Sequence, residues 1–145
     1  MGGRGARWSP ETGFDPKNWH QLSIPDDSGN MVLQTVAGVK VLQKIDGSTG
    51  LPFHSNTPNT MYYGMDKNGQ INQLRVFDGR NVKFDIDAPH AGAKGFAAEW
   101  HWQPWDSDGN RSRDHFPLSD DMLKKYGRYI DAAKEWNKKN KGKIK

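Results

Sequence analysis

Hydrophobic and polar residues alternate in two runs near the middle of the chain, 70–77 and 81–87, a pattern typical of β-strands that bury one face. The runs are joined at Asp78-Gly79-Arg80, and a three-residue loop there keeps the apolar positions of both strands on one side. This register pairs Leu74 with Phe84, Val76 with Val82 and Arg75 with Lys83. We therefore expect one core face and, opposite it, a mixed-charge surface.

Shorter signals predict the elements of the N-terminal half. An Asp-Pro pair with the residue types of a helix N-cap and first helical position predicts a short helix over 14–22. The segment 31–45 is rich in Val, Leu and Ile and predicts two short strands. Turn-forming residues dominate 46–59, which predicts a long loop carrying His54, and the aromatic run 60–65 predicts another strand.

The segment 95–103 shows a further alternation. Trp100 and Trp102 fall on one side, which we assign to the core, and Glu99 and His101 fall on the other. If this strand joins the hairpin in one sheet, four candidate site residues share a surface: Arg75, Lys83, Glu99 and His101.

A capped helix closes the sequence after a loop over 104–118. Ser119 is a favourable N-cap, and two aspartates follow it in the first turn. Six apolar residues then recur at helical spacing: Met122, Tyr126, Tyr129, Ile130, Ala133 and Trp136. The elements together predict an α+β fold, with a sheet of four or five mainly antiparallel strands, a short N-terminal helix and a long C-terminal helix packed on one face.

Composition and charge refine this picture. The chain has 145 residues and 21 basic against 17 acidic side chains, but five of the lysines lie in the last eight residues, which leaves 16 basic against 17 acidic in the remainder. We expect a Gly-rich linker or expression remnant over 1–13, a single domain over 14–137 and a basic tail over 138–145. A site for anions must then be a local cluster.

Several classes of protein are disfavoured by the sequence. The absence of cysteine excludes a disulfide framework, a Cys-ligated zinc site and a cysteine nucleophile. No stretch approaches the length of an apolar membrane span, so we expect no association with a membrane. The N-terminal residues also lack the apolar region of a secretion signal.

The predicted polar surface has the residue types that metal-free RNA cleavage requires. This reaction needs a base for the 2′-hydroxyl proton, an acid for the leaving 5′-oxygen and cations for the phosphorane charge. Glu99 can act as the base and His101 or His90 as the acid, without any cofactor or metal. Arg75 and Lys83 are the candidate phosphate-binding cations, and the candidate substrate-binding residues are Arg113, His115 and His54.

Each of these residues also has a purely structural interpretation. Glu99 and His101 beside Arg75 can form an ordinary cross-strand charge ladder, and His90 can be a turn histidine. Asp85 and Asp87 can ligate a metal together with His90, but we expect them to pair with the arginine and lysine across the strand.

The segment 73–87, followed by His90 and then by Glu99-Trp100-His101, resembles C-terminal toxin domains of bacterial polymorphic and contact-dependent inhibition systems. The shared pattern is a charged strand, a Gly-Arg turn, an Asp-Ile-Asp strand, a histidine and a second histidine-bearing strand. Many such domains belong to the barnase/EndoU/colicin/RelE-like class of metal-independent ribonucleases. In that class the helices usually precede the sheet, whereas the clearest helix here comes last.

The resemblance implies a function and a biological setting. The domain would be the C-terminal part of a larger secreted effector and would act in the cytoplasm of a target bacterium. Its substrate would be RNA, with tRNA as one candidate, cleaved by transesterification to a 2′,3′-cyclic phosphate. A cognate immunity protein, often acidic in such systems, would cover the site in the producing cell.

Two other functions compete with this interpretation. The segment 113–118 resembles the Asp-His and Pro of HNH nucleases, which favours a metal-dependent DNase, although the following helix 120–136 lacks the expected Asn and His. A non-catalytic module that binds nucleic acid or protein would need exposed aromatic side chains, and most aromatic residues here occupy core-periodic positions.

Overall fold

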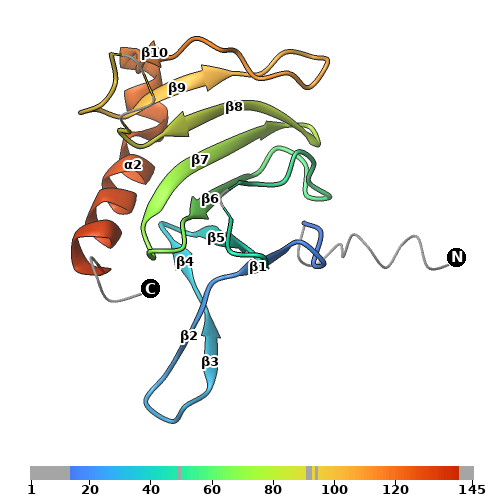
Figure 1. Ribbon diagram of the computed structural model, residues 1–145, viewed down its shortest axis with the longest axis vertical. Coiled ribbons are helices and arrows are strands. Elements are labelled where there is room, and N and C mark those ends of the chain that lie inside the picture. The colour runs from blue at the N-terminus through green and yellow to red at the C-terminus, as the bar shows by residue number, and fades with distance from the viewer. Residues whose placement is uncertain (1–13, 49, 91–92, 94, 141–145) are drawn as a thin grey trace, which may run out of the picture.

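The computed structural model describes residues 14–48, 50–90, 93 and 95–140, which form an α+β fold. Eight strands form one sheet in the order β1-β5-β6-β7-β8-β9-β10, with β4 paired to β5 beside this path, and β2 and β3 form a separate hairpin that projects from the body (Figure 1). Only the β5–β6 pair is parallel. The bounds are β1 Trp19–Gln21, β2 Ser23–Pro25, β3 Met31–Leu33, β4 Thr35–Val36, β5 Val39–Lys44, β6 Met61–Met65, β7 Ile71–Asp78, β8 Asn81–Asp87, β9 His101–Pro104, β10 Phe116–Pro117 and α2 Asp120–Asn140.

The predicted class is confirmed, but the sheet is larger than predicted and the expected N-terminal helix is wrong. Residues 16–18 form a single turn, in which the Asp15 carboxylate accepts the Lys17 backbone N–H at 3.0 Å. The chain then enters β1, where Trp19 pairs with Lys44. The capping residues act as predicted, but pairing with β5 ends the turn before a helix can extend. Strands of two to four residues are too short to show an alternation of apolar and polar residues, so the sequence predicts fewer strands than the sheet contains.

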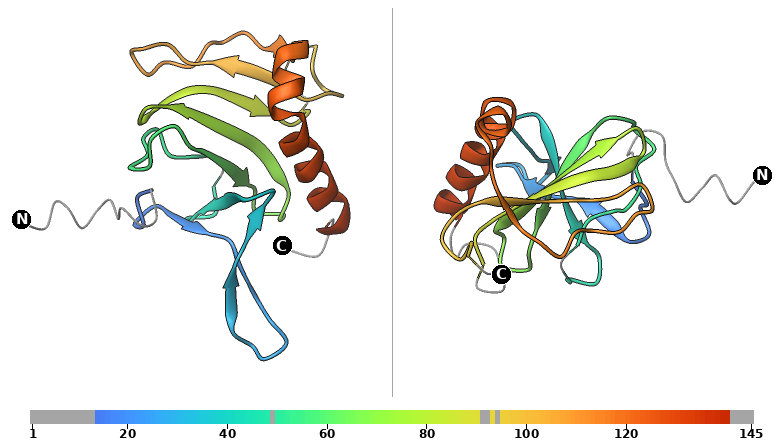
Figure 2. Two further views of the ribbon diagram at one scale, coloured as in Figure 1. Left: turned by 180° about the vertical axis from the view of Figure 1, so that it is seen from behind. Right: turned by 90° about the horizontal axis from the view of Figure 1, so that it is seen from above.

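Both faces of the sheet are buried. One face packs against α2 around Tyr63, Leu74 and Ile86. The other face carries a second apolar cluster: Phe14, Trp19, Leu42, Leu51, Tyr62, Phe77 and Val82. The helix lies along one side of the curved sheet in both views of Figure 2. On the other face, Phe14 and Trp19 from the start of the described chain and Leu51 pack over the strands. The expected solvent-exposed polar surface is therefore wrong for much of this face.

The central hairpin has a different register from the predicted one. A two-residue turn closes it, Leu74 pairs with Ile86, and Arg75 pairs with Asp85 instead of Lys83. The ladder steps from Val76–Phe84 to Phe77–Val82, which makes Lys83 an extra, bulged residue. Because the bulge inverts the alternation beyond it, Val82 joins the second core cluster while Phe84 stays in the first. The predicted register differs because it requires apolar and polar residues to alternate without a bulge along 81–87.

The C-terminal helix is confirmed. The Ser119 hydroxyl accepts the Met122 backbone N–H at 3.2 Å, as expected of an N-cap. The predicted apolar stripe packs on the sheet, with Tyr126, Ile130 and Ala133 fully buried. The helix continues through Asn140, so the first three residues of the expected basic tail are helical, while 1–13 and 141–145 lie outside the described residues. In the described part of the chain, no helix has both the length and the apolar character needed to cross a membrane.

Candidate active site

A cleft of about 750 Å³ opens on the face of the sheet opposite α2. Its walls come from the 50–53 segment, from the polar side chains of β7 and β8, and from the loops that follow β8 and β9. The charged and titratable residues that line it are Arg75, Asp87, His90, Arg111 and His115. The central strands therefore supply a rigid floor, and the loops supply most of the ionisable groups.

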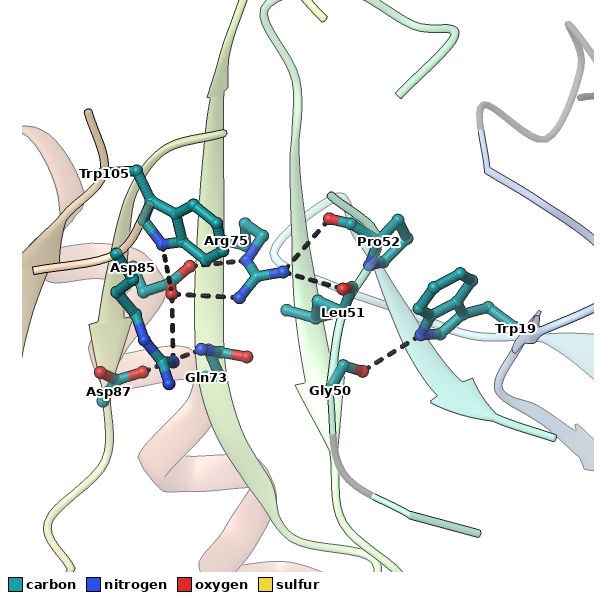
Figure 3. Close-up of polar contacts among 10 residues, drawn as sticks. Trp19, Gly50, Leu51, Pro52, Gln73, Arg75, Asp85, Asp87 and Trp105 are labelled. Atoms are coloured by element: carbon teal, nitrogen blue, oxygen red, sulfur yellow. Dashed lines mark hydrogen bonds and ion pairs between the residues drawn. The ribbon is translucent and has the colours of Figure 1, made fainter. Parts of the chain in front are cut away.

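The floor of the cleft is a buried ion pair. The Arg75 guanidinium donates to both carboxylate oxygens of Asp85, at 2.7 and 3.1 Å, and also to the carbonyls of Leu51 and Pro52 at 2.8 and 3.2 Å (Figure 3). The Trp105 indole N–H donates to Asp85 at 2.9 Å. These partners use most of the N–H donors of the guanidinium, so Arg75 anchors the 46–59 loop to the sheet. Few N–H donors remain for the predicted binding of phosphate.

Asp87 lies beside this pair with an incomplete set of partners. It is 7% exposed, lines the cleft and accepts one hydrogen bond from the Gln73 amide at 3.1 Å (Figure 3). Burial raises the pKa of Asp87 to about 7, and the neighbouring Asp85 carboxylate contributes to this rise. A carboxyl group in a cleft that is partly protonated at neutral pH can accept or donate a proton there.

Three histidines meet at one end of the cleft. His90 follows β8, His101 begins β9 and His115 precedes β10, and one ring nitrogen of each lies within 4.8 Å of those of the other two. The His101 and His115 ring centroids are 4.8 Å apart, and Phe96 lies 5.0 Å from His101 on a tilted plane. His90 and His115 line the cleft, whereas His101 is fully buried behind them.

Two nitrogens of this cluster are buried with no hydrogen-bond partner among the described residues, His101 Nε2 and His115 Nδ1. The other nitrogen of His101 lies 3.1 Å from the Glu99 carbonyl oxygen. Burial lowers the pKa of His101, and the nearby His115 and His90 lower it further. The pKa of His115 is lowered by burial and then by His90 and Arg111. Both imidazoles therefore favour the neutral form.

The structure brings together only some of the residues singled out from the sequence. Arg75, His90, His101 and His115 converge on the cleft or directly behind it. Glu99 is exposed, precedes β9 and contributes its carbonyl rather than its carboxylate. Lys83 lines a neighbouring hollow of about 500 Å³, and Arg113 and His54 do not line the main cleft.

The sequence analysis missed two residues of this site. The sequence predicts that Asp87 pairs with a cation or ligates a metal with Asp85 and His90. Arg111, in the 104–118 loop, is assigned no role, although it lines the cleft 3.7 Å from the Asp85 carboxylate. The position of Asp87 at the end of a strand, next to a turn, was the available signal. The neighbouring residues in the sequence do not show which of Arg111 and Arg113 lines the cleft. Arg111 lines it because it pairs with Trp105 across the loop, in an isolated β-bridge.

No family model matches the chain, and searches of curated proteins and of solved structures find no significant match.

Proposed function

We propose that this protein is an endoribonuclease that cleaves RNA in the cleft by metal-independent transesterification. The observation that carries the proposal is the convergence of one buried carboxyl group, two accessible imidazoles and a guanidinium on a single cleft: Asp87, His90, His115 and Arg111. These are the groups that proton transfer and phosphorane stabilisation require. The rigid strand that carries Asp87 favours preorganisation.

Each group has a defined task in this reaction. The Asp87 carboxylate accepts the proton of a 2′-hydroxyl, and the resulting 2′-oxygen attacks the adjacent phosphorus. The P–O5′ bond breaks as a protonated imidazole, that of His115 or His90, donates its proton to the leaving oxygen. The lowered pKa of His115 reduces its protonated fraction at neutral pH, but it also makes the protonated ring a stronger acid. The products are a 2′,3′-cyclic phosphate and a free 5′-hydroxyl, and Arg111 stabilises the charge on the phosphorane. In this scheme Asp87 takes the role that the sequence suggested for Glu99, and His101 positions the other two histidines.

The test is incubation of the purified protein with total bacterial RNA, with and without a metal chelator, followed by mapping of the fragment ends. We expect discrete fragments with 2′,3′-cyclic phosphate ends in both samples. Asp87→Asn and His115→Ala should each lower the cleavage rate by about 10²-fold or more, as expected for a lost base or acid.

Glu99→Gln is the matched control, because it neutralises a carboxylate that is exposed and outside the cleft. We expect it to retain nearly full activity. Intact RNA in both wild-type samples, or full activity in Asp87→Asn and His115→Ala, would refute the proposal. Cleavage of plasmid DNA that depends on Mg²⁺ would favour the metal-dependent DNase instead.

The setting of this activity rests on the resemblance of roughly residues 70–103 to toxin domains. We propose that the domain is delivered as the C-terminal part of a secreted effector, cleaves RNA (with tRNA as one candidate) in the target cytoplasm, and is neutralised by an immunity protein. Induced expression should then arrest bacterial growth, and Asp87→Asn should abolish the arrest without lowering the amount of protein.

A further inference from the structure

The three-histidine cluster has a feature that the proposed cleavage does not explain. His101 is fully buried, yet its Nε2 has no hydrogen-bond partner among the described residues, and the same is true of the buried His115 Nδ1. A buried polar atom without a partner costs free energy, commonly about 1–3 kcal/mol, so such groups usually face a ligand or water. The rings that carry these nitrogens lie edge to face with their centroids 4.8 Å apart, and their centroids are 5.4 and 5.8 Å from that of His90.

The spacing of the cluster fits a small cation. One nitrogen from each ring lies within 4.8 Å of the other two. Nitrogens that share a tetrahedral zinc ion at about 2.0–2.1 Å lie roughly 3.3 Å apart, so the rings must close by at most about 1.5 Å. His90 is exposed and lies just after β8, so it can make most of this movement, whereas His101 is buried and its ring packs 5.0 Å from that of Phe96.

We propose that His90, His101 and His115 form a binding site for a divalent transition-metal ion of the zinc class. Three imidazoles from separate segments, without oxygen ligands between them, favour such an ion over Mg²⁺ or Ca²⁺, which prefer oxygen. The fourth coordination position faces the cleft, because His90 and His115 both line it. A water molecule or a substrate phosphate oxygen can occupy that position.

The proposal has a consequence for activity that rests on the proposed ribonuclease function. A metal ion bound by His90 and His115 uses the lone pairs of the imidazoles that must carry the proton to the leaving 5′-oxygen. The bound ion therefore inhibits the metal-independent reaction, and a chelator restores it. Metal occupancy would keep the nuclease inactive wherever zinc is available and release it where zinc is scarce.

The test measures binding directly, on the full chain without a polyhistidine tag. Zn²⁺ is titrated against a chromophoric chelator, and Co²⁺ is titrated while its visible absorption reports tetrahedral coordination. We expect one equivalent of either ion to bind. His115→Ala and His90→Ala should each weaken binding by at least about tenfold. His20→Ala is the matched control, since His20 is exposed on β1 and contacts Gln43, and it should bind like the wild type.

Both surface variants keep the buried His101, so circular dichroism should show that they remain folded. Failure of the wild type to bind Zn²⁺ and Co²⁺ stoichiometrically, or retention of binding in the His90→Ala/His115→Ala double variant, would overturn the site. Faster RNA cleavage with added Zn²⁺ would overturn its inhibitory role. Binding without any RNA cleavage would instead overturn the proposed function and leave the metal site standing, so the two failures are distinguishable.

Discussion

Asp87 illustrates how a single residue can serve a site at the expense of stability. Its carboxyl group is nearly buried beside a second carboxylate, that of Asp85, which accepts hydrogen bonds from Arg75 and Trp105 and lies 3.7 Å from Arg111. Among the described residues, Gln73 is the one side chain that donates a hydrogen bond to the Asp87 carboxyl group. The ionised form is therefore held in an unfavourable environment, and a pKa near 7 follows from that placement. Strain of this kind is common at functional sites.

This placement predicts a pH dependence of stability. The folded pKa of about 7 lies above the ordinary value of 3.8, so between roughly pH 4 and 7 the folded state keeps a proton that the unfolded chain has lost. The free energy of unfolding therefore falls as the pH rises through this window. Asp87→Asn removes the ionisation, and at pH 8 it should raise the free energy of unfolding on the order of 3 kcal/mol, with little gain at pH 4.

The measurement is urea denaturation of both proteins at several pH values. Because the two proteins share the same histidines, the difference between them isolates Asp87. A difference that does not change between pH 4 and 8 would contradict the prediction. The same variant should lose ribonuclease activity while it gains stability, a combination that distinguishes a catalytic group from a structural one.

At the scale of elements, one hairpin turn occurs three times. The segments 26–30, 66–70 and 106–110 each begin with Asp and have Gly at the fourth position, with a φ of 79–86°. In each turn the Asp side chain accepts the backbone N–H groups of the third and fifth residues. This regular motif could have been found in the sequence, where the three copies stand 40 residues apart.

The position of each copy decides its contribution to stability. Asp66→Ala removes an acceptor for two N–H groups between β6 and β7, in the centre of the sheet, and should lower the free energy of unfolding by about 1–2 kcal/mol. Asp26→Ala removes the same two bonds from the projecting β2–β3 hairpin, where every turn residue is exposed, and should cost less than about 0.5 kcal/mol. Chemical denaturation of both variants tests this, and equal losses would contradict it.

On the scale of the whole molecule, the sheet is enclosed from both sides. The helix α2 is docked by polar contacts as well as by its apolar stripe. The Asn137 amide pairs with both backbone groups of Ile71, accepting its N–H at 2.6 Å and donating to its carbonyl at 2.9 Å. Tyr63 donates its hydroxyl to the Tyr129 carbonyl at 2.6 Å, and Trp136 donates to Gly69. The cleft lies on the opposite face, away from this interface.

Asn137→Ala should therefore destabilise the fold without altering the cleft. Leaving the Ile71 backbone groups partly buried and unpaired should lower the free energy of unfolding by about 1–3 kcal/mol. Asn140→Ala is the matched control, because within the described part of the chain the Asn140 amide donates only to the Trp136 carbonyl of the same helix. Thermal denaturation measures the stability of both variants. At 20 °C below its unfolding transition, Asn137→Ala should cleave RNA at the wild-type rate. A large loss of that rate would contradict a purely structural role for Asn137.

Features that depend on neighbouring residues can be predicted from the sequence. The capped C-terminal helix follows from Ser119 and a 3.6-residue period, and the central strands follow from alternation, because both patterns are produced by local backbone geometry. Local signals misplaced the 14–22 segment, since β1 gains its stability from β5, more than 20 residues away.

The chemistry of the polar face depends on contacts between residues that are far apart in the sequence. Alternation correctly placed Arg75 opposite the core side chains, but the cover provided by residues 50–53 makes it a buried anchor instead of an exposed cation. One bulged residue, Lys83, changed the register of the hairpin, and the loops after β8 and β9 brought His90 and His115 against His101. These outcomes depend on long-range packing, and burial, together with the neighbouring Asp85 carboxylate, raises the pKa of Asp87 to about 7.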